Sequence, residues 1–337
     1  MEHHTIFEES GRFGGWPANH GLWSWGNEIV VGFQSCVFKI IGDSNHAIDK
    51  TQPRVHLQAR SLDGGRNWIL EKPTVLQDFT PISTSTELQA VQFDINTPKA
   101  AITFKSNPQT HGSMLQFFST DACRSWKGPF EVSIFSGRVV EPRIDYIFEV
   151  SGKITAFLTA FKDNGEEGRV FCLRSMDSGA TWRFLSWIGE ERTGFNIMPS
   201  TVRLGANGFL CATRWQENGR WGIDTFISRD DGLTWKPHGN ILDADGLSNP
   251  PSMIRLADGR LCVTYGYRAK PYGIRAKLSS DEGLSWTDER VLRDDGGHWD
   301  LGYTRSVQVP DGDILTVYYF CRDKSRERTI EATIWRP

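Results

Sequence analysis

The sequence has no hydrophobic run long enough to form a membrane-spanning helix. Hydrophobic residues make up 39% of the 337 positions, but no apolar stretch approaches the roughly 20 residues that cross a bilayer. The opening residues MEHHTIFEES also lack the basic and apolar segments of a secretory signal. We therefore expect a cytoplasmic protein that does not bind membranes.

The chain also has little net charge. It contains 38 Lys and Arg against 41 Asp and Glu, a formal charge of −3. Domains that bind nucleic acids or anionic membranes commonly present a clear excess of basic residues. The charge balance therefore argues against nucleic acid as a partner.

Clustered cysteines are absent as well. The six cysteines are spread along the chain without a CxxC pair, at Cys36, Cys123, Cys172, Cys211, Cys262 and Cys321. Disulfide frameworks and metal sites need paired or clustered spacing. We therefore expect buried reduced thiols, no metal ion and no cofactor.

Amphipathic helical patterns are lacking, but a repeated octet, Ser-x-Asp-x-Gly-x-x-Trp, is present. It occurs at 61–68, 175–182, 228–235 and 279–286, and a variant at 119–126 has Cys in place of the Gly. The octet tryptophans lie between 51 and 58 residues apart, at Trp68, Trp126, Trp182, Trp235 and Trp286. A period of this size predicts a propeller or a solenoid.

Short alternating apolar runs separate the octets, as in NGFLCATRW and DGDILTVYYF. Such runs predict β-strands, and with the octet as a hairpin each repeat predicts a four-stranded blade. Five octets define five blades, and residues 301–335 supply a sixth that an N-terminal strand near 5–7 completes. The sequence thus predicts an all-β, six-bladed propeller forming a single domain over 1–337, rather than two α/β domains.

The octet itself is interpreted as a turn. The Asp carboxylate and Ser hydroxyl can bond to the turn backbone, Gly can adopt a positive φ, and Trp can pack beside the neighbouring strand. A calcium-binding loop is the alternative, but that motif needs several oxygen ligands and a distal Glu. Only one Asp is constant among the repeats, which favours the turn.

Five such octets at this spacing resemble the Asp boxes, or bacterial neuraminidase repeats, of the sialidase superfamily. The resemblance covers almost the whole chain and implies a sialidase-like propeller with a glycosidase site at its axis. That site would use an Asp as acid and base, a Tyr nucleophile assisted by a Glu, and three Arg that bind a carboxylate.

The resemblance implies a catalytic pair in this sequence. Asp49, twelve residues before Ser61, matches the acid/base Asp, and Tyr303, at the start of the sixth blade, matches the nucleophile. A general acid of this kind needs a raised pKa. The alternatives are a turn-capping Asp and a Tyr that packs at a strand entrance.

Arginines in two neighbouring blades resemble the carboxylate-binding set. Arg214 ends one strand and Arg268 ends the matching strand of the next blade, with Arg275 as a second candidate. A planar guanidinium binds a carboxylate through two hydrogen bonds, which explains the preference for arginine. The alternative is an ordinary surface arginine.

The sequence departs from the sialidase pattern at three places. The F/Y-R-I-P motif is absent, and Asn19 and His20 fall near the expected first arginine. Met198 stands near the position of the assisting Glu, and Tyr319 near that of the Glu that steadies the first arginine. These changes imply a pocket altered for a sugar other than ordinary sialosides.

Further substrate-binding candidates lie at predicted strand entrances. Glu141 and Arg143 could replace the missing charges, or form a salt bridge at the rim. His298 and Asp300 precede Tyr303, but zinc bound by them and His20 is disfavoured because the spacing is not that of a ligand set. Tryptophans outside the octets could stack on sugar rings or pack in the core: Trp16, Trp23, Trp25, Trp215, Trp221 and Trp299.

Two functional hypotheses follow. The first is an exo-acting glycoside hydrolase with a carbohydrate substrate, and the second is a non-catalytic propeller that binds a glycan or a protein. Turnover of a glycan would support the first hypothesis, and glycan binding without product would support the second. The enzyme is favoured because an Asp and a Tyr both fall at site spacings. The sequence predicts no particular oligomeric state.

Overall fold

The computed structural model describes residues 1–42, 45–77, 79–80, 97–107, 110, 112–135, 137–149, 152–244, 249–322 and 326–337. The chain is 54% strand and 2% helix. The described strands form six antiparallel sheets, with two short 3-10 helices, η1 (Pro17–Asn19) and η2 (Val75–Gln77). No helix in these ranges has the length and apolar character needed to cross a membrane.

The chain forms a six-bladed β-propeller with blades of antiparallel strands, as the octet period predicted. The described residues divide into two compact units, unit 1 (Met1–Lys72 with Leu242–Pro337) and unit 2 (Pro73–Ile241). The single domain over 1–337 stays a prediction, and each unit is described by itself.

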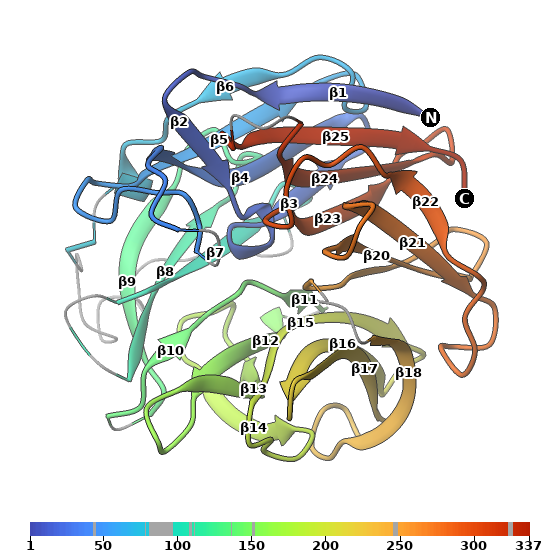
Figure 1. The fold of residues 1–337 in the computed structure, drawn as a ribbon. Helices are drawn as coiled ribbons and strands as arrows, with labels where there is room; N and C mark the ends of the chain where they lie inside the picture. Colours follow the sequence, from blue (N-terminus) through green and yellow to red (C-terminus); the bar gives the residue numbers. More distant parts are fainter. Residues whose placement is uncertain are drawn as a thin grey trace. The chain divides into compact units, whose positions relative to one another are not determined.

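Unit 1 contains three of the described sheets (Figure 1). The first consists of β2 (Arg12–Gly15), β3 (Leu22–Trp25), β4 (Glu28–Val37), β5 (Val55–Ser61) and β6 (Ile69–Glu71). The second consists of β19 (Ser252–Arg255), β20 (Leu261–Tyr267), β21 (Gly273–Ser279) and β22 (Arg290–Arg293). The third consists of β23 (Gly302–Gln308), β24 (Ile314–Phe320), β25 (Thr329–Trp335) and β1 (Glu2–Phe7).

The N-terminal strand completes the last blade. β1 lies beside β25 in Figure 1 and pairs with it antiparallel, with Thr5 opposite Glu331 and Phe7 opposite Ile330. The sheet order is β23, β24, β25, β1. This pairing confirms the predicted closure, because β1 bonds to the backbone groups at the otherwise open edge of β25.

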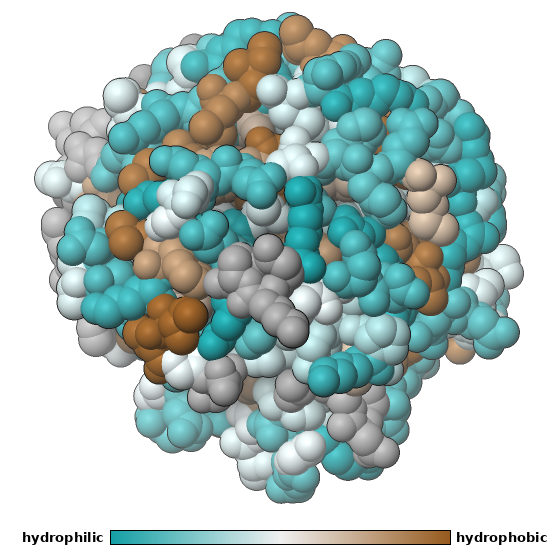
Figure 2. All heavy atoms as spheres, turned by 45° about the horizontal axis from the view of Figure 1, so that its top comes forward, coloured by the Kyte–Doolittle hydropathy of each residue, from teal (hydrophilic) through white to brown (hydrophobic). Residues whose placement is uncertain are grey.

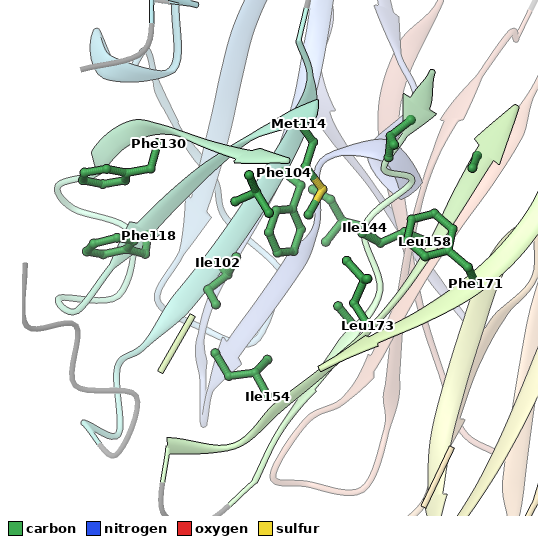
Figure 3. Packing of buried hydrophobic residues seen from close by; sticks show 14 of the residues in the cluster. Ile102, Phe104, Met114, Phe118, Phe130, Ile144, Ile154, Leu158, Phe171 and Leu173 are labelled. Carbon is green, nitrogen blue, oxygen red and sulfur yellow. The ribbon is translucent and has the colours of Figure 1, made fainter. Parts of the chain in front are cut away.

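Unit 2 contains the other three described sheets. The first consists of β7 (Ala101–Ser106), β8 (Ser113–Ser119) and β9 (Lys127–Ser133). The second consists of β10 (Val140–Glu141), β11 (Tyr146–Phe148), β12 (Ile154–Phe161), β13 (Glu167–Ser175) and β14 (Arg183–Ile188). The third consists of β15 (Phe195–Leu204), β16 (Gly208–Glu217), β17 (Arg220–Ser228) and β18 (Lys236–Ala244). Figure 3 shows the core between the first two, where Phe104 and Met114 lie close to Leu158 and Phe171. Burial of such apolar side chains is the main term that holds neighbouring blades together.

Each octet forms the turn between two neighbouring strands of one blade, as 279–286 shows between β21 and β22. The Ser279 hydroxyl donates to Asp281 Oδ1 at 2.8 Å and accepts from the Gly283 amide at 2.8 Å. The Ser285 amide donates to the same Asp281 oxygen at 2.9 Å. Gly283 has a φ of +86°, so the predicted turn chemistry is confirmed.

The variant octet keeps this turn without its glycine. Cys123 adopts a φ of +61°, and its amide donates to the Ser119 hydroxyl at 2.9 Å. Trp182 of the next octet also reaches the preceding blade, since its Nε1 donates to Gln116 Oε1 at 2.7 Å. The octet is therefore a structural device that shapes a turn and joins blades.

The octet carboxylates make the fold sensitive to acid. Hydrogen bonds from the Ser285 hydroxyl and amide, and then from Ser279, lower the pKa of Asp281 to about 2. Because the pKa is lower in the folded state, the ionised carboxylate stabilises the fold at pH values above the unfolded-state pKa of about 3.9. This stabilisation is lost as the pH falls toward the folded-state pKa. Asp281→Asn should therefore flatten the decline in unfolding free energy between about pH 4 and pH 2. Urea denaturation at a series of pH values checks this, and equal slopes in both proteins would contradict it.

All six cysteines are buried and free of disulfides, as expected. Burial raises the pKa of Cys172 to about 12, which keeps its thiol protonated. On the face drawn in Figure 2, hydrophobic residues form small groups between hydrophilic ones. The large exposed hydrophobic side chains include single residues of the octet turns, such as Leu233 and Leu284.

Candidate functional site in unit 1

A buried carboxylate connects several of the predicted site residues of unit 1. Asp300 lies just before β23, and its side chain is inaccessible to solvent. Its Oδ1 accepts hydrogen bonds from the Tyr319 hydroxyl at 2.5 Å and from His46 Nδ1 at 2.8 Å. Two arginines lie beside the carboxylate, and we call Asp300, His46, Tyr319, Arg268 and Arg328 the Asp300 cluster.

The two arginines supply the charge that a buried carboxylate needs. Arg268 Nη2 lies 3.8 Å from Asp300 Oδ1, and Arg328 Nη2 lies 3.6 Å from Oδ2. Burial acts to raise the pKa of Asp300, but the hydrogen bond from His46 and the nearby positive charges lower it to about 2. The carboxylate is therefore ionised at neutral pH, since buried charges persist when they are paired.

Tyr319 lies on β24, near the position where the sialidase resemblance implies a Glu. Its hydroxyl donates to Asp300 and accepts a hydrogen bond from Arg268 Nη2 at 3.0 Å. Burial and the adjacent carboxylate raise the pKa of Tyr319 far above its usual value. The phenol thus stays neutral and links the carboxylate to the guanidinium.

Tyr303, the predicted nucleophile, lies at the start of β23 against this cluster. Its ring packs edge-on against Tyr319 with centroids 5.7 Å apart, and the Arg268 guanidinium carbon lies 5.7 Å from the Tyr303 ring centroid. The residue is 8% exposed. No hydrogen bond to its hydroxyl is found within the described part of the chain.

The backbone of Tyr303 is left-handed, with a φ of +48°. Non-glycine residues near the first strands of other sheets share this feature, at Trp16, Arg143 and Met198. The register of β15 shifts around Met198, and that of β23 shifts around Tyr303. Bulges of this kind change the direction in which a side chain points. Because several sheets share the left-handed backbone, it is the tyrosine side chain that distinguishes position 303.

Asp49 differs from its expected state. Its carboxylate accepts hydrogen bonds from the Thr51 hydroxyl at 2.7 Å, the Thr51 amide at 3.0 Å and Lys39 Nζ at 3.2 Å. The bonds from Thr51, and then that from Lys39, lower the pKa of Asp49. The expectation of a raised pKa is therefore wrong, because these contacts are those of a turn-capping carboxylate.

His46 was missed by the sequence reasoning. It lies in the connection between β4 and β5, and its ring packs edge-on against Trp16 at 4.9 Å and Phe13 at 6.1 Å between centroids. Its hydrogen-bond partner Asp300 is 254 positions away in the chain. No local motif marks such a pair.

The other predicted residues of unit 1 have structural contacts. His298 Nδ1 accepts from the Asp300 amide at 3.1 Å and from Arg328 Nη2 at 2.8 Å. The Arg268 guanidinium carbon lies 5.1 Å from the Trp299 ring centroid. The His20 ring lies 5.2 Å from that of His56, and the described residues include no group of three potential metal ligands.

The direct role expected of Asp300 also needs correction. The sequence suggested that Asp300 contacts substrate, but its side chain is fully buried. The second arginine candidate, Arg275, is buried too and donates to the Pro271 carbonyl at 3.1 Å. Both residues therefore hold other parts of unit 1 in place.

No protein-family model and no curated protein matches the sequence. Solved structures do match it. A protein of unknown function from Dyadobacter fermentans is 20% identical, with 99% of this chain and 98% of that chain covered and a TM-score of 0.78. A Hadza microbial sialidase is 13% identical, with 97% and 66% covered and a TM-score of 0.64. The NanB sialidase from Streptococcus pneumoniae is 12% identical, with 99% and 70% covered and a TM-score of 0.62. The chain has the sialidase-like propeller fold.

Two predicted residues of this sialidase-like propeller lie on β16 in unit 2. The Arg214 guanidinium carbon lies 5.2 Å from the Phe195 ring centroid and 5.1 Å from that of Trp221. Trp215 is 7% exposed, and the Arg192 guanidinium carbon lies 4.4 Å from its ring centroid. Aromatic rings thus hold the Arg214 guanidinium through cation–π contacts.

Glu141 and Arg143 lie on and just after β10, also in unit 2. Arg143 donates to both carboxylate oxygens of Glu167, each at 3.1 Å. Glu141 Oε2 accepts a hydrogen bond from the Ser106 hydroxyl at 2.9 Å. The salt bridge considered from the sequence is therefore present at Arg143, while Glu141 is bonded to a neighbouring blade.

Proposed function

We propose that this sialidase-like propeller is an exo-acting glycoside hydrolase whose substrate is a sugar other than an ordinary sialoside. The observation that carries the proposal is the Tyr303 hydroxyl, which has no hydrogen-bond partner among the described residues although its ring is packed against Arg268 and Tyr319. The Arg268 guanidinium carbon lies 5.7 Å from the Tyr303 ring centroid, so a positive charge lies beside the phenol. Tyr303 attacks the anomeric carbon, or stabilises the positive charge that develops there.

Positively charged side chains are the proposed substrate-binding groups. Arg268 is buried and held by Tyr319 and by the Leu301 carbonyl, at 3.0 and 3.3 Å. Such fixed guanidinium groups suit an acidic or hydroxyl-rich substrate. Within unit 1, His20 and His298 are further proposed contacts. The substrate-binding roles that the sequence suggested for unit 2 stay predictions, at Arg214, Trp215, Glu141 and Arg143.

The departures from the sialidase pattern support a different sugar. Met198 carries no charge where an assisting Glu is implied, and His20 falls near the position of the first arginine. A carboxylate-bearing sugar would lose one of its three guanidinium partners. This loss reduces the affinity for a sialoside more than for a neutral sugar.

A substrate panel tests the proposal. The purified chain is incubated with aryl glycosides and natural oligosaccharides, sialosides included, and the anomeric products are followed by NMR. We expect turnover of at least one non-sialoside and little turnover of sialosides. Rapid sialoside cleavage would overturn the altered specificity, and saturable glycan binding without product would instead support the non-catalytic propeller.

A further inference from the structure

We infer that His46 is the proton-transferring residue of this site and that Asp300 positions its ring. The inference rests on the proposed glycosidase function and replaces Asp49 in the role of general acid. Three observations carry it: the His46–Asp300 hydrogen bond, the contrast in exposure between the two side chains, and their connection to Tyr303 through Tyr319.

The hydrogen bond fixes the tautomer of the imidazole. Asp300 is ionised and can only accept, so the 2.8 Å contact requires the proton on His46 Nδ1. Nε2 is then the nitrogen left to exchange a proton with a substrate. In many enzymes that use a nucleophile, a carboxylate sets the orientation of the residue that acts as acid and base.

Exposure decides which partner meets the substrate. The side chain of His46 is 34% exposed, whereas that of Asp300 is 0% exposed. Trp16 and Phe13 pack against the imidazole and hold its plane. The carboxylate therefore acts through the imidazole, and only the imidazole reaches solvent.

The same scaffold supports the predicted nucleophile. Tyr319 donates to Asp300 at 2.5 Å and packs against the Tyr303 ring at 5.7 Å between centroids. The Trp16 ring centroid lies 6.3 Å from that of Tyr319. One buried tyrosine thus connects the proton-transferring pair to Tyr303 within unit 1.

The proton balance of the reaction closes with these groups. Protonated His46 gives its Nε2 proton to the glycosidic oxygen as the bond to the anomeric carbon breaks, and the electron pair of that bond leaves with the alcohol. Water then adds to the oxocarbenium-like carbon beside Tyr303, and its proton returns to Nε2. The net reaction converts a glycoside and water into a free sugar and an alcohol.

Leaving-group dependence tests the inference. In His46→Asn the amide of the new side chain can still donate to Asp300, but no ring nitrogen remains to transfer a proton. With an alkyl glycoside of the preferred sugar, we expect turnover to fall about 100- to 10,000-fold, the usual range for a lost general acid. With the 2,4-dinitrophenyl glycoside, which leaves without protonation, we expect a loss of less than about tenfold.

Asp49→Asn is the matched control, because it removes the carboxylate that the sialidase resemblance implies as the acid. We expect it to lower turnover of both substrates by the same small factor. If Asp49→Asn lost most of its turnover of the alkyl glycoside alone, and His46→Asn did not, the inference would be overturned. The glycosidase function would still stand. Absence of turnover by the wild-type chain on every glycoside would instead refute the proposed function, and this inference with it.

Thermal melts of His46→Asn and His46→Gln separate a chemical role from a structural one. We expect both variants to melt close to the wild-type temperature, because the imidazole is partly exposed. Equal losses on both substrates, or loss of the folding transition in both variants, would show that His46 supports the fold and would overturn the inference.

Discussion

Tyr303→Phe should lower turnover at least about 100-fold, equivalent to ~2.7 kcal/mol of lost transition-state stabilisation. The change removes only the hydroxyl, which is the group proposed to meet the anomeric carbon. The ring remains, together with its packing against Tyr319 and its contact with Arg268. Steady-state rates on the best substrate of the panel measure the effect, and we expect the melting temperature to stay close to that of the wild type.

Tyr272→Phe is the control for this substitution. Tyr272 lies in unit 1, four positions after Arg268 in the sequence, and packs against the core shared by β20, β21 and β24, but it takes no part in the hydrogen bonds and ring contacts described for the Asp300 cluster. Its loss of a hydroxyl should leave turnover unchanged. Wild-type turnover in Tyr303→Phe would remove this residue from the reaction, and a large drop in melting temperature would point to a structural role.

Asp300→Ala should destabilise the protein by about 3–5 kcal/mol, the cost of breaking a buried ion pair from one side. The substitution leaves two buried guanidinium groups without their carboxylate, since Arg268 is 6% and Arg328 0% exposed. The hydroxyl of Tyr319 and the Nδ1 proton of His46 lose their acceptor as well. Urea denaturation followed by tryptophan fluorescence measures the unfolding free energy.

Asp300→Asn and Asp49→Ala provide the comparisons for this measurement. The asparagine oxygen can still accept from Tyr319 and His46, so we expect a smaller loss than with alanine. Asp49 bonds to the exposed Lys39 and to its own turn, so we expect only a slight change. An unfolding free energy within about 1 kcal/mol of wild type in Asp300→Ala would show that the ion pairs do not stabilise the fold.

The blade pattern was predictable because it depends on short-range chemistry. The Ser279 hydroxyl, the Asp281 carboxylate and the Gly283 amide are all within five residues, so the turn can be recognised in the sequence. The strand near 5–7 was predicted because the sixth repeat lacked an edge partner. Both features were confirmed in the structure.

The candidate site was predictable only in part. Tyr303, Arg268 and Asp300 were selected from positions in the repeat, and the structure brings them into one region of unit 1. For Asp49, hydrogen bonds from Thr51 and Lys39 lower the pKa, whereas the general-acid role implied by its sequence position needs a raised pKa. The turn-capping alternative therefore describes its contacts better.

The sequence by itself determined the number of blades, their turns and the strand that closes the last one, because these depend on side chains that bond to nearby backbone. Only the tertiary structure decided which carboxylate is buried and which imidazole stays exposed. Asp300 meets His46 across 254 positions, and its desolvation is offset only when Arg268 and Arg328 pack beside it. Burial and charge pairing of this kind arise from the packed fold, which no local pattern records.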